Sequence, residues 1–356
     1  MSLALSIVAA GARTPIGLGA LSTALGLRAG KSGLSGAPFA GRQREMVVAG
    51  LIPTLPWAPS SERAARLARD AIREVLAALP PPLAGKRVAV LLQLSAEADT
   101  EIVRREAAGL VEAMLRVELG RTEQLGEVSI TASMTPGGKA TPADALLRAA
   151  AMLDAKEADV VLWGGAHSDI STASIRALAD AGRLFDAQHV DSVVPGECAA
   201  VVALVSPARA ASMGPRATIE GAGGADTEAT PANELPVSGD ALAFAIQAAM
   251  ATSSDEPAGW VISDTAYEAL HVREWELVQV RLRAHLGVPY RWDALPQRIG
   301  RTGAAQLPLA AAVVAASFDV GHVPSPSILA LGGTDAGRRS AVWMRAIAGS
   351  SGAAGG

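Results

Sequence analysis

A single cysteine, Cys198, occurs among the 356 residues, and aromatic residues make up only 3% of them. One cysteine excludes a disulfide framework and a multi-cysteine metal site, and it suits the reducing cytoplasm, where we expect this protein to act. The 31 Lys and Arg residues are outnumbered by 35 Asp and Glu residues, which leaves a net charge of -4. Because no stripe of basic residues occurs either, the charge argues against nucleic-acid binding.

Long hydrophobic runs are also missing, although half of the residues are hydrophobic. The apolar stretch Leu307–Phe318 is too short to span a bilayer, so we expect a buried helix there and no membrane association. The first residues, MSLALSIVAAGA, are apolar like the core of a signal sequence, but no Lys or Arg precedes that core. A first buried strand is therefore the better interpretation.

The stretch from Glu127 to Gly165 predicts a strand, a glycine-rich turn, a helix and a second strand. The helix is expected over Pro142–Asp154, with Thr141 as its cap and Asp144 at the positive end of its dipole. A strand, turn and helix N-terminus in this order is how many enzymes present a nucleophile. This turn contains none.

The second half repeats the pattern. A glycine turn, Gly300–Gly303, precedes an Ala-rich helix over Gln306–Ser317, and the strand Ser327–Leu331 ends on a double glycine. The segment SILALGG thus corresponds to VVLWGG in the first half. Strands alternating with helices, and repeated once, predict two similar α/β halves packed about a pseudo-two-fold axis.

We place the first half at residues 1–210 and the second at 211–348, followed by a flexible Gly/Ala tail over 349–356. Two connecting segments complete the prediction. Ser32–Ser60 is expected to be a polar, Pro-rich crossing, and Ala266–Leu286 a single long helix.

Five motifs, in the right order over nearly the whole chain, resemble β-ketoacyl synthases. They are SIVAAGARTPIG, which resembles their opening strand and turn; EADVVLWGG, the strand and double glycine; LFDAQHVDSVVPGECAAVVAL, the Pro-Phe-Asp and Gly-Glu-Gly-Ala region; IGRTGAAQ, the Gly-His-Thr turn; and LALGGTDAG, the Gly-Phe-Gly-Gly-Thr-Asn loop. The resemblance implies the thiolase-like fold: duplicated βαβαβαββ halves packed as five layers.

The departures from this family fall on its catalytic residues. The nucleophilic cysteine is expected at Lys139 or Ala140, the first histidine at Asp264, and the second at Arg301, while Pro296 stands in place of the family's lysine. None of these residues can perform the family's condensation. The resemblance therefore implies a protein with no catalytic residues, no cofactor and no metal site.

The turn that admits the phosphopantetheine arm in the family is also altered, because Tyr267 and Glu268 add bulk and charge to it. If the fold is kept, Asp264 and Arg301 converge at the former active site. We predict that they form a salt bridge there, joined by Glu268, since neither charge is easily buried alone. The alternative is that the site opens and both side chains point to water.

Other candidate chemistry receives structural interpretations. Ser129, Ser133 and Thr135, with His167 beyond the double glycine, could suggest a serine hydrolase, but no third group is evident and no G-x-S-x-G turn exists. The remaining candidates are expected to be a solvated Lys139, a buried structural Cys198, His271 and His285 misaligned for a metal, and His189 and His322 in turns. The histidines thus predict no site.

Three functions stay open. The first is a non-catalytic protein that binds an unidentified protein partner, as an adaptor or chaperone of the kind that accompanies secretion effectors. The second is a chain-length-factor-like subunit paired with an active ketosynthase, and the third is a thiolase-fold acyltransferase with reassigned residues. The resemblance implies that assembly, as a homodimer or a heterodimer, uses the strand near Val128–Ser133.

Overall fold

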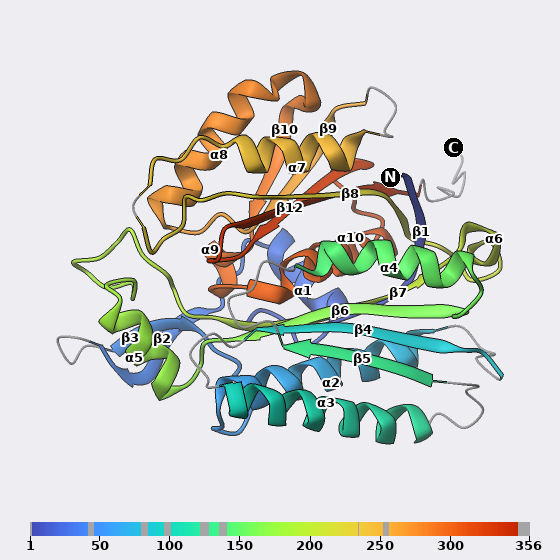
Figure 1. The fold of residues 1–356 in the computed structure, drawn as a ribbon, viewed down its shortest axis with the longest axis horizontal. Coiled ribbons are helices and arrows are strands. Elements are labelled where there is room, and N and C mark those ends of the chain that lie inside the picture. The colour runs from blue at the N-terminus through green and yellow to red at the C-terminus, as the bar shows by residue number, and fades with distance from the viewer. Residues whose placement is uncertain are drawn as a thin grey trace, which may run out of the picture.

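The computed structural model describes residues 2–41, 46–79, 85–95, 101–121, 128–134, 141–233, 235–251 and 256–347. Ten of its strands form one sheet, in the order β10-β9-β11-β12-β8-β1-β7-β6-β4-β5 (Figure 1). The first-half strands are β1 (Ser2–Arg13), β4 (Val88–Ser95), β5 (Val128–Met134), β6 (Val160–Ser168) and β7 (Glu197–Val205). The second-half strands are β8 (Ala217–Asp226), β9 (Ala258–Ser263), β10 (Leu286–Ala294), β11 (Ser327–Gly333) and β12 (Arg338–Ala346).

The two halves of the sheet mirror each other about the antiparallel pair β1–β8. In the first half the pairs β1–β7 and β7–β6 are antiparallel, whereas the pairs β6–β4 and β4–β5 are parallel. In the second half β8, β12 and β11 are antiparallel, and β9 and β10 join in parallel. This repeated order confirms the predicted duplication.

Helices separate and cover the two halves of the sheet. The central layer holds α4 (Pro142–Asp154) and α10 (Gln306–Asp319), the first-half outer layer α2 (Ser60–Ala78) and α3 (Glu101–Arg121), and the second-half outer layer α7 (Asp240–Met250) and α8 (Ala269–Arg281). The smaller elements are α1 (Ala20–Arg28), β2 (Leu34–Ala40), β3 (Met46–Gly50), α5 (Thr172–Asp180), α6 (Pro207–Ala210), η1 (Arg283–His285), α9 (Pro296–Ile299) and η2 (Gly303–Ala305). Helix, sheet, helix, sheet and helix make the five layers expected (Figure 1).

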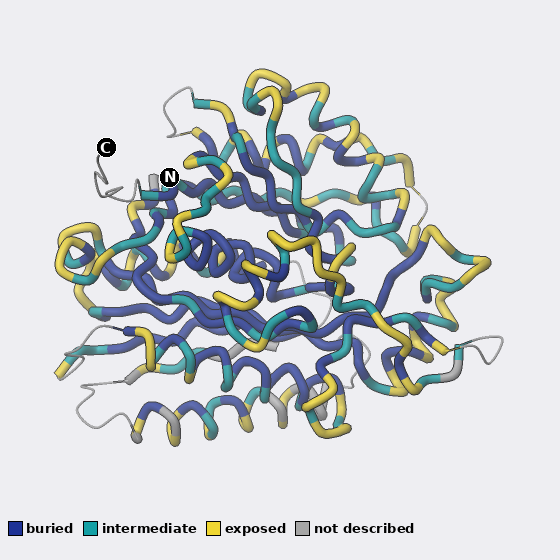
Figure 2. The backbone as a smooth tube through the Cα atoms, turned by 180° about the vertical axis from the view of Figure 1, so that it is seen from behind, coloured by how far each residue is buried: buried dark blue, intermediate teal, exposed yellow. Residues whose placement is uncertain are grey.

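The two central helices differ in burial, as their sequences require. Every residue from Gln306 to Ser317 of α10 is buried, which agrees with its uniformly apolar sequence. Helix α4 is amphipathic: Leu146 is buried, whereas Leu147 is exposed on the outer side. Its predicted start is confirmed, because Thr141 and Asp144 form a reciprocal capping box. Figure 2 shows the buried central strands and the partly exposed outer helices.

Two segments differ from the prediction. The expected helix over Ala266–Leu286 is shorter, α8, and is followed by strand β10, whose Pro289 is tolerated because β10 is an edge strand. The expected crossing Ser32–Ser60 contains an antiparallel hairpin, β2–β3. Its fully buried residues Ala37 and Ala49 are small, so the hairpin gives no strong apolar alternation in the sequence although Val47 is buried as well.

Other predictions have mixed outcomes. Strand β5 lies at the edge of the first-half sheet, as expected. No helix in the described part of the chain is long and apolar enough to cross a membrane. The boundary at residues 210 and 211 stays a prediction, and the tail 349–356 lies outside the described residues.

Candidate functional site

A small cavity lies where the loops before α10 meet the second half of the sheet. Its volume is about 50 Å³, and both Asp264 and Arg301 line it. The other lining residues are Val193, Val194, Ala266, Tyr267, Glu268, His271, Pro296, Thr302, Gly303, Gly333, Thr334 and Asp335. The fold therefore brings together the two positions at which the resemblance places histidines. Lys139 and Ala140 lie outside the described residues.

Arg301 is held by two carboxylates, and neither belongs to the predicted partner. Its Nε and Nη2 donate to the two oxygens of Asp169 at 2.8 and 2.6 Å, and its Nη1 donates to Asp335 at 2.9 Å. The predicted Asp264–Arg301 salt bridge is therefore wrong: these two described residues line one cavity, but no ion pair joins them. Asp169 is 1% exposed, so it needs a bidentate cationic partner more than the half-buried Asp264 does.

Arg183 extends the network on the Asp335 side. It donates to both oxygens of Glu268, at 2.8 and 3.0 Å, and to Asp335 at 2.7 Å. Glu268 thus joins the network through Arg183, and not through an Asp264–Arg301 pair as predicted. Burial alone would raise the pKa of Asp335, but Arg301 and Arg183 outweigh it and hold that pKa well below its ordinary range.

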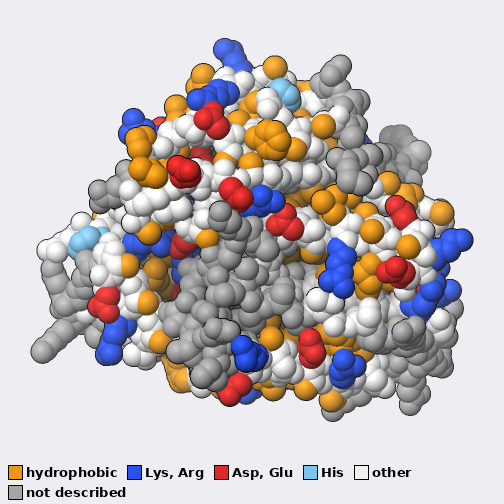
Figure 3. All heavy atoms as spheres, viewed as in Figure 1, with side chains coloured by type: hydrophobic (Ala, Val, Ile, Leu, Met, Phe, Trp, Pro, Cys, Tyr) orange, Lys and Arg blue, Asp and Glu red, His pale blue; other side chains and the backbone are white. Residues whose placement is uncertain are grey.

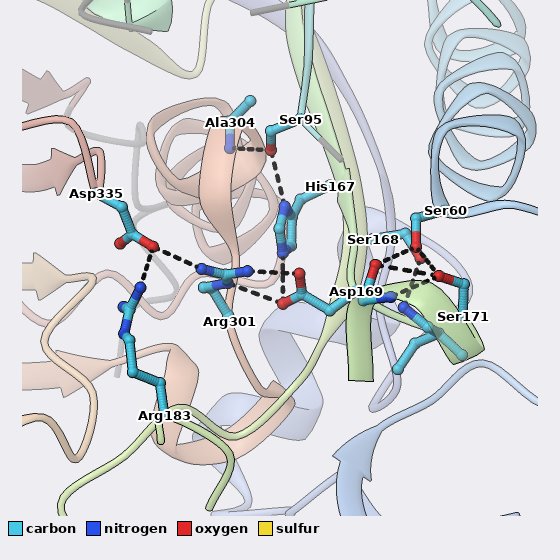
Figure 4. Close-up of polar contacts among 12 residues, drawn as sticks. Ser60, Ser95, His167, Ser168, Asp169, Ser171, Arg183, Arg301, Ala304 and Asp335 are labelled. Atoms are coloured by element: carbon cyan, nitrogen blue, oxygen red, sulfur yellow. Dashed lines mark hydrogen bonds and ion pairs between the residues drawn. The ribbon is translucent and has the colours of Figure 1, made fainter. Parts of the chain in front are cut away.

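On its other side, Asp169 is bonded to a buried histidine. The Nε2 of His167 lies 2.9 Å from Asp169 Oδ2, and its Nδ1 lies 2.8 Å from the hydroxyl of Ser95. Backbone N–H of Ala304 donates to the same hydroxyl at 3.0 Å. Figure 4 shows the resulting chain from Arg183 through Asp335, Arg301, Asp169 and His167 to Ser95.

Asp169, in the middle of this series of polar contacts, is charged. Burial by itself raises the pKa of Asp169, but the charge of Arg301 and the hydrogen bond with His167 outweigh burial, so the pKa falls far below its ordinary value of 3.8. Asp169 is therefore an ionised acceptor. A buried carboxylate of this kind persists only because both of its oxygens have donors.

Sequence reasoning missed Ser95, Asp169 and Arg183, and it found no third group for His167. The signal for Asp169 was present, because residues two apart at the end of a strand point to the same side. The signal for Ser95 was not, because it depends on the parallel register of β4 with β6, in which Ser95 pairs with His167.

A second buried ion pair belongs to the Gly-Glu motif of the resemblance. Both oxygens of Glu197 accept from Arg63, at 2.7 and 2.8 Å, and both side chains are fully buried. Glu197 also accepts the N–H of Ile52 at 2.7 Å. This pair ties α2 and the chain after β3 to the start of β7, so its role is structural.

Of the remaining candidates, Cys198 agrees with its interpretation as a buried structural thiol, whereas Lys139 lies outside the described residues. Cys198 is buried, and burial, followed by the charges of Glu197 and Asp169, raises the pKa of its thiol far above the ordinary value. No group of three His, Cys, Asp or Glu residues suited to a metal occurs in the described part of the chain. Added Cβ atoms at Gly332 and Gly333 would crowd Leu307 and Arg338, which supports packing roles for these glycines.

No protein-family model and no curated protein sequence matches this chain. Solved structures do. A chain of AntDE:AntF, a type II PKS acyl-carrier protein in complex with its ketosynthase bound to the hexaketide, superposes with a TM-score of 0.76 at 18% identity, over 98% of this chain and 100% of that one. This chain has the thiolase-like ketosynthase fold.

Two further structures agree with that assignment of the fold. The ishigamide ketosynthase/chain length factor matches with a TM-score of 0.75 at 18% identity, over 98% of this chain and 100% of that one. The ketosynthase from module 6 of the bacillaene synthase of Bacillus subtilis 168 matches with 0.73 at 14% identity, over 97% and 72% of the respective chains.

Within this ketosynthase fold, the chemistry of the cavity is limited. Among the described lining residues, His271 supplies an imidazole and no residue supplies a thiol. The His271 ring lies 3.9 Å from Glu268, the carboxylate that also binds Arg183. Arg301 has carboxylates at all three of its nitrogens, so its charge is already balanced within the protein.

Proposed function

We propose that this ketosynthase-fold protein does not condense acyl thioesters and acts by binding a protein partner, as an adaptor or chaperone. The observation that carries the proposal concerns Arg301, the residue that stands where the family has its second histidine. Arg301 is bonded to Asp169 and Asp335. A guanidinium in two ion pairs neither releases a proton nor accepts one, so it cannot replace an imidazole.

The size of the cavity supports the same proposal. Pockets for ligands of ordinary size measure roughly 300–1,000 Å³. The cavity at Asp264 and Arg301 has about 50 Å³, and the side chains of Tyr267 and Glu268 form part of its wall. That space is far too small for a phosphopantetheine arm with its acyl chain.

Activity measurements test the loss of condensation directly. Purified protein, incubated with an acyl thioester and a malonyl carrier thioester, is expected to form no condensed product and to release no carbon dioxide above background. A single Ala140→Cys change is expected to leave this unchanged, because Asp264 and Arg301 still replace both histidines. Condensation by the wild type that is lost on substitution of Asp264 or Arg301 would overturn the proposal.

The partner surface we propose is the edge of β5. The two edges of the sheet differ: β10 carries Pro289 together with Arg291 and Asp293, which discourage strand addition, whereas β5 (VSITASM) carries neither proline nor charge. Arg148 of α4 reaches Thr131 of β5 at 3.4 Å, so the exposed face of α4 adjoins this edge. A second copy or a different chain can add a strand here.

Among the coloured residues of the face seen in Figure 3, Lys and Arg are interspersed with Asp and Glu between hydrophobic side chains, and these residues form no field of one sign. This distribution suits a protein partner better than a nucleic acid. Light scattering at micromolar concentration is expected to report a dimer, or a monomer that becomes a heterodimer when the partner is added. A chain that stays monomeric and takes no partner would contradict the proposal.

The chain-length-factor alternative is favoured by one observation, the similarity to the ishigamide ketosynthase/chain length factor. Co-expression with an active ketosynthase encoded beside it separates the alternatives. A stable one-to-one complex that makes a longer product than the ketosynthase alone supports a chain-length-factor role. Genes for secretion components or effectors nearby, and co-purification with an effector, support the adaptor.

A further inference from the structure

The chain of polar contacts ends in an arrangement that neither condensation nor partner binding uses. Ser95, His167 and Asp169 lie in line, with contacts of 2.8 Å from the hydroxyl to Nδ1 and 2.9 Å from Nε2 to the carboxylate (Figure 4). They come from the ends of two neighbouring parallel strands, β4 and β6, and from the residue just beyond β6. From this geometry we propose that Ser95 is a latent acyl-accepting nucleophile, with His167 as its base.

The direction of each hydrogen bond follows from the donors available. Asp169 is ionised and can only accept, so the Nε2 of His167 carries the hydrogen between them. In the neutral imidazole, Nδ1 is then the acceptor, and the hydroxyl of Ser95 must donate to it. The N–H of Ala304 donates to the same hydroxyl oxygen, which leaves the hydroxyl hydrogen free to point at His167. This is the protonation pattern that activates a serine.

Gly303 lines the cavity and packs directly against Ser95 and His167. A Cβ added at Gly303 would lie 2.6 Å from the hydroxyl oxygen of Ser95 and would also collide with the ring of His167. In the described part of the chain, Gly303, which has no side chain, thus lies between the cavity and the hydroxyl of Ser95, a residue that is 8% exposed. The cavity, at about 50 Å³, has room for an acyl group of acetyl size and for no long chain.

The step we propose is acyl transfer from a short activated ester or thioester. The hydroxyl oxygen of Ser95 bonds to the carbonyl carbon while its proton passes to Nδ1 of His167, and Asp169 stabilises the imidazolium. The bond to the alcohol or thiol then breaks, and His167 returns the proton to that leaving group. Water releases the acyl group by the same route as a carboxylic acid. No oxidant, reductant or metal is needed.

The experiment uses 4-nitrophenyl acetate with the whole purified chain, followed by mass spectrometry of its peptides. We expect one acetyl group on the peptide containing Ser95, formed with a burst of nitrophenol. Ser95→Ala should abolish the burst, and His167→Asn should slow it by about 100-fold or more, the usual contribution of a general base. Ser263→Ala is the matched control, because Ser263 is also buried at a strand end but donates to Thr265.

A second variant keeps the test decisive if Ser95→Ala does not fold. In Ser95→Cys, iodoacetamide should alkylate the new thiol and leave the buried Cys198 unmodified. Acetylation confined to lysines, a burst unchanged in Ser95→Ala, or protection of the Ser95→Cys thiol equal to that of Cys198 would each overturn the proposal. The relay would then serve only to hold β4 against β6. Condensation assays and partner binding are separate readouts, so either proposal can fail alone.

Discussion

The two double glycines of this protein occupy equivalent places in the two halves, yet the chain around them is packed differently. A Cβ at Gly165 on β6 would overlap the carbonyl oxygen of Ala304, whereas a Cβ at Gly333 on β11 would meet the carbonyl of Arg338 at 3.0 Å. Two residues beyond each pair stand His167 and Asp335. The first is fully buried, and the second lines the cavity.

The strands that pair with the double-glycine strands also differ, because the pairing extends further in the first half than in the second. Strand β4 stays paired with β6 as far as Ser95 and His167, whereas β9 pairs with β11 only over Trp260–Ile262. The chain after β9 then turns into the loop that lines the cavity. A duplicated sequence has thus produced one closed half and one open half. Charged side chains fill the boundary between them, because Arg301 bonds to Asp169 of the first half and Asp335 of the second.

The largest expected effect comes from breaking the ion pair that crosses this boundary. Arg301→Met leaves Asp169 buried with two of its three side-chain donors missing, and loss of one partner of a buried pair costs about 3–5 kcal/mol. The free energy of unfolding, measured with urea, should fall by that amount. In the double variant with Asp169→Asn, the loss should be smaller than the sum of the single losses.

The pair Arg63–Glu197 is the matched control within the closed half. It is fully buried on both sides, so Arg63→Met should lower the free energy of unfolding by about as much as Arg301→Met. If the loss of stability in the double variant instead equals the sum of the losses in Arg301→Met and Asp169→Asn, the pair is not coupled and the boundary is solvated.

The next largest effects should come from alanine substitutions at the double glycines, which should destabilise the first half more than the second. Gly165→Ala forces a methyl group against the backbone of Ala304, so we expect the upper range of overpacking costs, about 3 kcal/mol or more. Gly333→Ala requires a shift of only a few tenths of an ångström and should cost about 1 kcal/mol. Thermal unfolding of both variants gives the comparison. Similar losses would show that the open half is as tightly packed as the closed half.

The two sheet edges give a third contrast. A charge at the exposed Ser129 of β5, as in Ser129→Lys, should weaken assembly through this edge by about 10-fold, or roughly 1.4 kcal/mol, because a charged side chain on an edge strand discourages strand addition. Val288→Lys on β10 is the control, because Val288 is already exposed on an edge that carries proline and charge. Sedimentation over a concentration series measures both. Weaker assembly in the Val288 variant alone would place the interface on β10.

The smallest loss of stability should come from lowering the pH, and Asp169 of the first half and Asp335 of the second half should contribute to it unequally. The pKa values of Asp169 and Asp335 are lowered in the folded chain from 3.8, so their stabilisation is complete above about pH 4 and is lost as the pH falls below it. Stability measured from pH 5 to pH 2 should therefore decline. The decline should be shallower in Asp335→Asn, and the partly exposed Asp335 should contribute less to it than the buried Asp169. A decline that begins near neutral pH would point to other groups.

Most of the elements, and their order along the chain, follow from local signals in the sequence. The cap at Thr141, the apolar helix Gln306–Ser317 and the double glycines are local signals, and each depends on residues only a few positions apart. The position of β5 at the edge of the sheet was predicted from its alternating sequence together with the resemblance to the family. Strand β10 was missed because Gly287 and Pro289 obscured its start, and edge strands tolerate both.

Only the tertiary structure decided which charges meet. Asp169 lies 132 residues from Arg301 in sequence, and Ser95 lies 72 residues from His167. Asp264 reaches the expected cavity, but the buried Asp169 and the carboxylate of Asp335 take the guanidinium instead. The physical reason is that a buried charge binds the partner whose geometry and desolvation favour it most, and both depend on strand register and packing across the two halves. No local pattern in the sequence encodes that competition.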